Sequence, residues 1–567
     1  MSRPVSGTIK TSLVKAKQKN GDIYVLERKS VYDPQKGYTR SLGTHLVGKI
    51  PAGQTEMIPT RPKRQKTQNS TIQASRQRVG LTRILEWIGK QSGIDEDLYA
   101  ATDEATAQKI LTLAQYWLAN GSHSLPHLEK WQITHQTPYP EGLSESTYHR
   151  LFEDLGRDEG VQQRYFKNRA QRLDESPSIA FDSTTVSTYS KHQIDARQGF
   201  NKAEDGLDTI KLLTLYSVKS HQPIAFNKQP GNLPDVTSLQ NALKQLNFLD
   251  LKHPLIVTDN GYYSQNNVTE FTRNHTQFLT LASIDVKWIQ EQLQAHREEL
   301  ETAGSLCPWD RSIHGITVPV MHEISWVRER SRGEIAAGDV VKKAHRYYLH
   351  FFLNRNNVAR DEQRLLDQLW LLREQILQGQ TLSEAAQKRA DKYLIVHHRG
   401  RGGKLQVQFN EEVIKEARKN YGYFVLLSNQ TMDCFEALAT YRMREKIEEA
   451  FKVQKDRLDG TRPRVWNSDN LRGRFFVQFI ALGYYCFLHN QLKVLKESLG
   501  TDKQLSKTEL DQELGLKRWL EQRSLGQILD WFGCVEETTV ETPVARSRWT
   551  TESTERDRLL LTKLGIQ

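Results

Sequence analysis

The chain has 567 residues, of which 37% are hydrophobic and 26% are charged. This composition is ordinary for a globular protein of roughly two to four domains and excludes a wholly disordered chain. There is no run of eighteen apolar residues, and the polar amino terminus lacks the apolar segment of a signal peptide, so we expect a cytoplasmic protein with no membrane partner. The four cysteines are far apart in the sequence, which predicts free thiols and disfavours a structural zinc site.

Positive charge is concentrated at the amino-terminal end. The net charge of the whole chain is +11, whereas residues 1–80 hold 16 Lys and Arg against 4 Asp and Glu, a balance of +12. The rest of the chain is therefore nearly neutral. A basic end on a neutral body favours a nucleic-acid partner. A basic surface that only keeps the protein in solution is the alternative.

The first 174 residues are expected to form a small β module, a linker and a helical domain. Residues 1–55 contain short alternating runs broken by turn pairs such as Asn20-Gly21, which predict β-hairpins. Residues 56–79 are rich in Pro, Gln, Thr and basic residues and predict a flexible basic linker. Residues 80–174 show apolar residues at helical spacing and predict a DNA-binding domain of about five helices. Residues 144–154 could be the second helix of a helix-turn-helix, although an ordinary short helix is the more frequent explanation.

The remaining chain predicts an α/β fold with an interrupted core. Residues 175–283 hold three strand-like runs and then alternate helix and buried strand, which is the order of an RNase H-like core with a mixed sheet. Residues 284–430 mix β runs with a charged helix and predict a β-rich insertion subdomain. Residues 431–500 resume the core with a helix at 441–455 and a long apolar helix that covers the sheet. Residues 501–567 are expected to form a C-terminal helical region.

The expected helix at 441–455 has a polar stripe. At about 100° of rotation per residue, Tyr441, Arg444, Glu448 and Lys455 lie within about 60° of one another, with apolar residues on the other side. One carboxylate set among cations and a tyrosine suits a group of acids that meets a polyanion. A solvated face with Glu–Lys and Glu–Arg pairs is the alternative.

Two aspartates follow predicted strands. Asp182 ends the first strand of the core and Asp259 ends the fourth, and each of them alone is more often a turn residue than a catalyst. If these strands are parallel neighbours, both carboxylates emerge at the same edge of the sheet. Together with Glu448 they could bind two Mg²⁺ or Mn²⁺ ions about 4 Å apart, which suits cleavage of a phosphodiester. Arg444 and Lys455 would then hold the flanking phosphates.

Three motifs resemble those of DDE transposases of the insertion-sequence-four family. The spacing of Tyr441, Arg444, Glu448 and Lys455 is similar to the signature of that family. The strings Phe181-Asp-Ser-Thr-Thr and Thr258-Asp-Asn-Gly-Tyr-Tyr resemble its first and second aspartate motifs. Neighbouring strings, including Ile447-Glu-Glu-Ala-Phe and Arg462-Pro463, resemble a subgroup with an amino-terminal β module. The resemblance covers about residues 175–500.

This resemblance implies a retroviral-integrase-like fold and a transposase for a DNA element of the insertion-sequence type. The enzyme would bind the terminal inverted repeats of the element in double-stranded DNA, cleave at its ends and transfer the 3′-OH strands to target DNA. Asp182, Asp259 and Glu448 match the metal-binding triad, and Tyr441, Arg444 and Lys455 match the residues that grip the element's end. The resemblance further implies a homodimer in the synaptic complex and, within a bacterial cytoplasm, association with the nucleoid.

Phe424 occupies the place where well-studied relatives carry an aromatic that stacks on a flipped base. Tryptophan is the residue expected there, so the chain departs from the pattern, and a core aromatic is at least as good an explanation of Phe424.

Two other functions stay open. One is a metal-dependent nuclease on the same RNase H-like fold that hydrolyses DNA without strand transfer, and the other is a domesticated, non-enzymatic DNA-binding protein. Three acids in the right order weigh against the second, because a pure binder gains nothing from negative charge near phosphate. The sequence does not identify the terminal repeat, the target preference, the hairpin or copying pathway, the oligomeric state without DNA, or the role of the β module.

Overall fold

The computed structural model describes residues 9–33, 36–60, 73–121, 125–174, 177–199, 201, 205–328, 338–398, 405–444, 452–453, 465–542, 545–551 and 553–566. The chain divides into two compact units. The first comprises Met1–Ser75 and Thr539–Arg548, and the second comprises Arg76–Thr538 and Trp549–Gln567.

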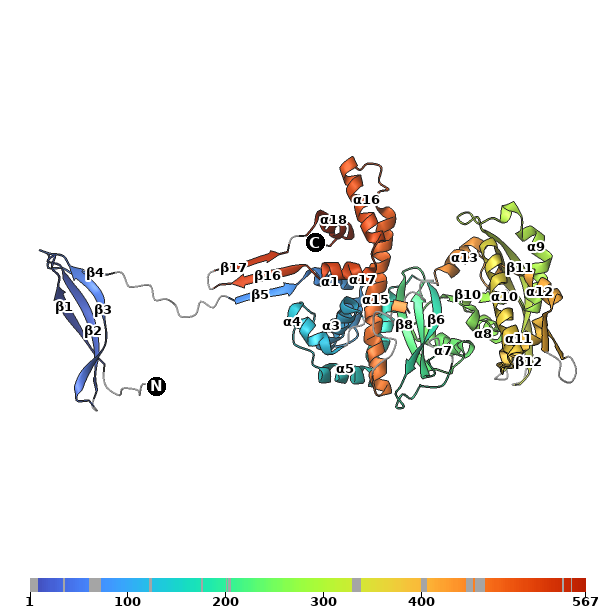
Figure 1. Ribbon diagram of the computed structural model, residues 1–567, viewed down its shortest axis with the longest axis horizontal. Coiled ribbons are helices and arrows are strands. Elements are labelled where there is room, and N and C mark those ends of the chain that lie inside the picture. Colours follow the sequence, from blue (N-terminus) through green and yellow to red (C-terminus); the bar gives the residue numbers. More distant parts are fainter. Residues whose placement is uncertain are drawn as a thin grey trace. The chain divides into compact units, whose positions relative to one another are not determined.

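The first unit contains a four-stranded antiparallel sheet in the order β1-β2-β3-β4 (Figure 1). A turn at Asn20-Gly21 joins the first two strands, and Gly21 adopts a left-handed φ of +87°, so the hairpin predicted there is confirmed. Only a few side chains of the sheet, among them Val25 and Val31, are buried. The strands are β1 (Ile9–Lys17), β2 (Ile23–Asp33), β3 (Tyr38–Ile50) and β4 (Ile58–Pro59).

Three further strands were not predicted from the sequence. They pair in the order β17-β16-β5, and the division between the two units passes through them. β5 lies within the predicted linker, of which residues 61–72 lie outside the described part. Its sequence, Gln-Ala-Ser-Arg-Gln-Arg, is polar on both faces, so periodicity gives no strand signal. The strands are β5 (Gln73–Arg78), β16 (Glu536–Glu541) and β17 (Arg546–Thr550).

The described part of the predicted helical domain contains six α-helices rather than about five. Asp103 caps α3, because its carboxylate accepts a hydrogen bond from the Thr106 backbone N–H (3.0 Å). Gly93 ends α1 with a φ of +69°, a conformation that glycine adopts without strain. The helices are α1 (Gly80–Ser92), α2 (Ile94–Tyr99), α3 (Glu104–Asn120), α4 (Leu128–Thr134), α5 (Glu145–Arg157) and α6 (Gly160–Gln171).

The largest sheet has eight strands in the order β11-β12-β15-β10-β9-β6-β7-β8. From β6 the chain makes antiparallel hairpins to β7 and β8, crosses through α7 to β9, which is parallel to β6, and continues through α8 to β10, which is parallel to β9. All seven segments that the sequence predicts for residues 175–283 are therefore confirmed. They are β6 (Ser178–Thr188), β7 (Asp208–Ser217), β8 (Gln222–Pro230), α7 (Asp235–Phe248), β9 (Leu255–Thr258), α8 (Gln265–Arg273) and β10 (Gln277–Ala282).

Three of the strands predicted within residues 284–430 extend this same sheet. β15 (Tyr423–Ser428) pairs antiparallel with β10, β12 (Val340–Asn354) with β15, and β11 (Ile313–Val327) with β12. The pairing covers the β10 edge, which would otherwise expose unpaired backbone groups. α9 (Lys287–Leu300) contacts β11 and β12.

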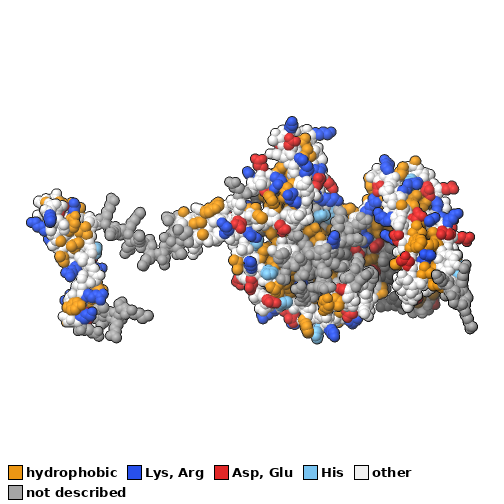
Figure 2. Space-filling view, viewed as in Figure 1, with side chains coloured by type: hydrophobic (Ala, Val, Ile, Leu, Met, Phe, Trp, Pro, Cys, Tyr) orange, Lys and Arg blue, Asp and Glu red, His pale blue; other side chains and the backbone are white. Residues whose placement is uncertain are grey.

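A smaller part of the insertion has its own apolar core, which includes Leu369, Leu394 and Ile414. It contains the hairpin of β13 (Leu394–His398) and β14 (Leu405–Phe409). Figure 2 shows hydrophobic side chains at the surface over α10, where Trp370 and Leu371 are exposed. The helices around this core are α10 (Arg355–Leu377), α11 (Glu384–Tyr393) and α12 (Glu411–Arg418).

Helix α15 (Ser468–Ser498) is the long apolar helix that the sequence predicts. It contacts α1, α3 and α5 of the helical domain and also strand β8 of the large sheet, so it is buried on most of its circumference. This explains why apolar residues surround it rather than forming a stripe.

The crossing of α15 and α5 depends on two glycines. A Cβ atom at Gly473 would overlap the carbonyl group of Phe152, and one at Gly156 would overlap the carbonyl group of Asp469. Each helix thus contributes one glycine to the crossing. In α5, Gly156 lies four residues after Phe152, and in α15, Gly473 lies four residues after Asp469. The two backbones approach more closely than any side chain would allow.

Asp95 links α2 to α15 and makes the stability of the folded state depend on pH. The Tyr484 hydroxyl donates a hydrogen bond to its carboxylate, while burial raises the pKa of Asp95 to about 6. In the unfolded chain the group titrates near pH 4, so between about pH 4 and 6 the folded state binds more protons and its stability falls as the pH rises. We expect the stability of Asp95→Asn relative to wild type to increase by up to about 3 kcal/mol between pH 4 and 7. Urea unfolding at several pH values checks this, and parallel curves for the two proteins would contradict it.

The carboxyl-terminal region after residue 501 contains three helices in addition to β16 and β17. Ser506, Ser524 and Thr554 each cap one of these helices through a complete capping box. The helices are α16 (Lys507–Glu521), α17 (Leu525–Phe532) and α18 (Glu555–Leu564). Among the described residues, none of the helices combines the length and the hydropathy that a membrane span requires.

Candidate active site

Asp182 and Asp259 lie at matching positions along two neighbouring parallel strands. Asp259 directly follows β9 as predicted, whereas the prediction that Asp182 ends its strand is wrong, because β6 continues to Thr188 through its pairing with β7. β6 and β9 pair with Ala180 opposite Val257, and continuing this register by two residues brings Asp182 opposite Asp259. The strand arrangement that the sequence argument required is therefore present. Both carboxylates are also anchored locally, because Asp182 accepts a hydrogen bond from the Ser183 backbone N–H (2.8 Å) and Asp259 from that of Asn260 (2.7 Å).

Arg444 bridges the two aspartates. One guanidinium nitrogen lies 3.4 Å from Asp182 Oδ2 and the other lies 3.5 Å from Asp259 Oδ2. The Tyr441 hydroxyl donates a hydrogen bond to Asp259 Oδ1 (3.1 Å), and the Arg444 guanidinium lies 5.5 Å from the centre of the Tyr441 ring. Burial, reinforced by the negative charge of Asp259, raises the pKa of Tyr441, so its hydroxyl keeps the proton that it donates. A cation thus offsets the repulsion between the two carboxylates.

The helix that carries Tyr441 differs from the prediction. Helix α13 spans Cys434–Arg442, so it begins earlier than expected, and the chain forms a turn at Met443 and Arg444. Tyr441 is 9% exposed and Arg444 is 5% exposed. The alternative of a solvated face is therefore not supported for these two residues. They turn inward because the two aspartates provide buried partners for a hydroxyl group and a guanidinium group.

The other two residues of the signature, Glu448 and Lys455, lie outside the described residues. Within the described part of the chain, no group of three or more Asp, Glu, His or Cys side chains is arranged to hold a metal ion. Two of the three proposed metal ligands are thus brought together here.

The family comparison agrees with this arrangement of acids. A family model described as "Transposase DDE domain" matches residues 174–483, which is more than half of the chain. The chain belongs to this family. The search of curated proteins gave no match. One solved structure that resembles the transposase is described as a piggyBac transposase synaptic complex with hairpin DNA. It is 9% identical, covers 79% of this chain and 81% of that chain, and has a TM-score of 0.33, a likeness too distant to support a statement about function.

Asp235 is a further carboxylate of the transposase domain close to Asp182, and the sequence analysis did not find it. It begins helix α7, accepts a hydrogen bond from Ser183 Oγ (2.7 Å) and pairs with Lys211 Nζ at 2.8 Å. Burial raises the pKa of the neighbouring Tyr262 well above its ordinary value, and the charges of Asp235 and Asp182 add to this effect. Because Lys211 neutralises Asp235, we infer that Asp235 supports Ser183, the residue after Asp182 on β6. A Pro-Asp pair at a helix start is a common cap, so the local pattern contains no signal of this contact.

Phe424 of the transposase lies on β15 opposite Phe352, and the two rings are stacked with centroids 4.8 Å apart. Phe352 is fully buried, whereas Phe424 is half-buried and packs against the main core. These contacts are those of a core aromatic, which is the alternative that the sequence left open.

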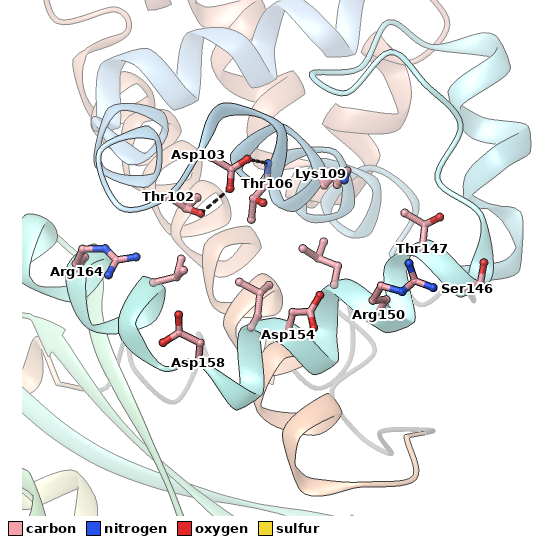
Figure 3. A pocket seen from close by; sticks show the side chains of 13 residues that line it. Thr102, Asp103, Thr106, Lys109, Ser146, Thr147, Arg150, Asp154, Asp158 and Arg164 are labelled. Atoms are coloured by element: carbon pink, nitrogen blue, oxygen red, sulfur yellow. Dashed lines mark hydrogen bonds between the residues drawn. The ribbon is translucent and has the colours of Figure 1, made fainter.

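The helices of residues 80–174 enclose a cavity of about 590 Å³ between the start of α3, α5 and α6 (Figure 3). Asp103, Asp154 and Asp158 line its wall together with Lys109, Arg150 and Arg164, so the charges balance. Ten residues separate α4 from α5, in contrast to the short turn of a helix-turn-helix. The buried face of α5 packs on α15. The structure therefore does not support α5 as the second helix of that motif.

Proposed function

We propose that the protein is an active transposase that binds the terminal inverted repeats of a mobile DNA element, cleaves at its ends and joins the 3′-OH strands to target DNA. The observation that carries this proposal is the meeting of Asp182 and Asp259 at matching positions of parallel strands, bridged by Arg444, within a transposase DDE domain. Asp259 follows the carboxyl end of β9, where ligands bind in α/β sheets, and Asp182 lies beside it on β6.

We further propose that β6 to β10 form an RNase H-like core. Across the sheet these strands lie in the order β8-β7-β6-β9-β10, which is the third, second, first, fourth and fifth strand of the core. The first three strands are antiparallel to their neighbours in the chain, and the last two are parallel to the first. On this proposal residues 175–283 and 431–500 are the two parts of the core and residues 284–430 are the insertion. Residues 1–55, 56–79, 80–174 and 501–567 are the β module, the linker, the DNA-binding helices and the C-terminal region. The insertion-sequence-four subgroup is part of the same proposal.

The residues present fit two divalent ions, Mg²⁺ or Mn²⁺, held by Asp182, Asp259 and Glu448. Asp182 and Asp259 offer hard oxygen ligands. Arg444 lies between them, which supports the proposal that the two carboxylates form a site for cations. Such ions, when bound, activate an attacking oxygen and stabilise the leaving oxygen of a phosphodiester. Glu448, six residues after the end of α13, would be the third carboxylate ligand.

Tyr441, Arg444 and Lys455 are proposed to hold the DNA end. Arg444 reaches a phosphate only if its guanidinium leaves at least one of the two aspartates, because both contacts engage it in the present arrangement. Arg444 would therefore neutralise the two aspartates in the absence of DNA and contact a phosphate only when DNA is bound. The Tyr441 hydroxyl would stay on Asp259 and orient that carboxylate, and the Tyr441 ring would contact a base of the DNA end. Stacking of Phe424 on a base would require its ring to part from Phe352. Two element ends must meet, so a homodimer on DNA is part of the proposal.

The experiment is a donor-plasmid assay. Purified protein, Mg²⁺ and a supercoiled plasmid that carries the element's terminal repeats should yield products in which the 3′ ends are joined to new DNA sites. Donor cleavage without joining would overturn the proposal in favour of a nuclease on the same fold. A plasmid with scrambled repeats is the control and should remain uncut.

A further inference from the structure

A second cationic site lies in the carboxyl-terminal region, at a place for which neither the sequence motifs nor the family match gives a role. Helices α16 and α18 contact one another (Figure 1). A pocket of about 570 Å³ lies between them. It lies outside the matched residues 174–483. Three arginines and one glutamate provide its charged walls: Arg518, Arg523, Arg556 and Glu555. The walls therefore carry an excess of positive charge.

Two of these arginines stack on a single indole ring. The guanidinium carbons of Arg523 and Arg556 lie 4.7 Å and 4.4 Å from the centre of the Trp519 ring. Each stacking contact is favourable alone, but the two contacts together bring two positive charges to the same indole ring. Asp557 partly neutralises Arg556, because its Oδ1 accepts a hydrogen bond from Arg556 Nη2 (3.1 Å). Arg523 and Arg518 form no ion pair with the described residues. An anion bound between the arginines would relieve the repulsion between their charges.

Two residues that line the pocket carry hydrogen-bond donors that the described protein atoms do not satisfy. Trp519 is 6% exposed, and neither its indole N–H nor the buried Nε–H of Arg556 has an acceptor among the described residues. Native proteins satisfy most buried donors, so two unpartnered donors at one pocket are unusual. The remaining guanidinium groups make one backbone contact each, from Arg523 Nη1 to the Trp519 carbonyl (3.3 Å) and from Arg518 Nε to the Leu514 carbonyl (3.4 Å). Most of their donors are therefore available to a ligand.

We propose that this pocket binds a phosphate group of the DNA backbone. Phosphate matches an arginine pocket because the planar guanidinium presents two parallel N–H donors to two oxygens of one group. The choice of DNA as the source rests on the proposed function, since a transposase must grip duplex DNA beyond the cleavage site. Binding is independent of sequence, because only backbone oxygens are recognised.

The test compares two substitutions with the same change of charge. Arg523→Gln removes a pocket arginine, whereas Arg558→Gln removes an exposed arginine of the same region that does not line the pocket. In the full-length protein, affinity for a duplex of arbitrary sequence is measured at several KCl concentrations. Arg523→Gln should raise Kd about tenfold at low salt and lower the salt slope by about one, and Arg558→Gln should change Kd less than about twofold. Arg518→Gln, at an exposed side chain, repeats the test if Arg523→Gln folds poorly.

A second arm uses inorganic phosphate, so that the anion site is tested without DNA. Phosphate, compared with chloride at equal ionic strength, should raise the Tm of wild type and Arg558→Gln but not of Arg523→Gln. A phosphate effect without any selective loss of DNA affinity would overturn the assignment to the DNA backbone and leave a free phosphate ester as the ligand. Equal behaviour of the two variants in both arms would overturn the site altogether. Neither arm requires cleavage, so a failure of the proposed catalysis would be seen separately.

Discussion

Asp182→Asn is expected to abolish DNA cleavage while leaving binding of the element's end intact. The substitution keeps the shape of the side chain and removes the charge that would hold a divalent ion. Loss of an outer-shell partner already costs about 10–100-fold in metal sites, so loss of a direct ligand should cost at least about 100-fold in cleavage rate. Asp259→Asn and Glu448→Gln should have the same effect. Cleavage is followed on a labelled duplex that carries the terminal repeat, and binding is followed by gel shift.

The matched control is Asp285→Asn, which makes the same change at an exposed position after β10. It should cleave like wild type. End binding by Asp182→Asn should be equal to wild type or slightly tighter, because a negative charge near phosphate has been removed. Cleavage retained by any of the three triad variants would remove that residue from the metal site.

The second large effect is expected at the helix crossing. Gly473→Ala would place a Cβ atom against the Phe152 carbonyl, and because this atom is backbone, it cannot move aside as a flexible side chain could. Overpacking of this kind costs about 3 kcal/mol or more when the backbone must shift. The midpoint of urea unfolding, measured by circular dichroism, should fall accordingly.

Gly515→Ala is the matched control for that substitution. Gly515 also lies within a helix, α16, but a Cβ atom there would have no heavy atom within 4 Å. Alanine should therefore raise stability by up to about 1 kcal/mol through its better helix propensity. Equal unfolding midpoints for Gly473→Ala and wild type would show that α5 and α15 are not packed as closely as described.

The core strands could be predicted because burial gives them a strong pattern. β9 and β10 are short, largely buried and mostly apolar runs, and the apolar run at the start of β6 stops at Asp182, so the strands and the position of Asp182 along the chain could be predicted. The parallel pairing of β6 and β9 was a condition that the sequence could state but not test. Register cannot be read from one strand, because it depends on the partner.

The sequence failed where tertiary contacts override local pattern. Helical spacing placed Tyr441 and Arg444 on a polar stripe, but two aspartates remote in sequence draw both side chains inward and the helix ends at Arg442. The contact between Asp235 and Ser183 joins residues 52 positions apart through side chains only, which no periodicity encodes. β16 and β17 were missed because polar strands lack the alternation that marks a half-buried strand.

The central claim is that Asp182, Asp259 and Glu448 share divalent ions at a bound DNA end. The most direct measurement is anomalous diffraction from Mn²⁺ in crystals of the protein with a terminal-repeat duplex. We predict manganese peaks within about 2.0–2.3 Å of carboxylate oxygens from all three residues, close to the terminal phosphodiester. Manganese bound elsewhere, or a Glu448 carboxylate remote from the two aspartates, would contradict the account.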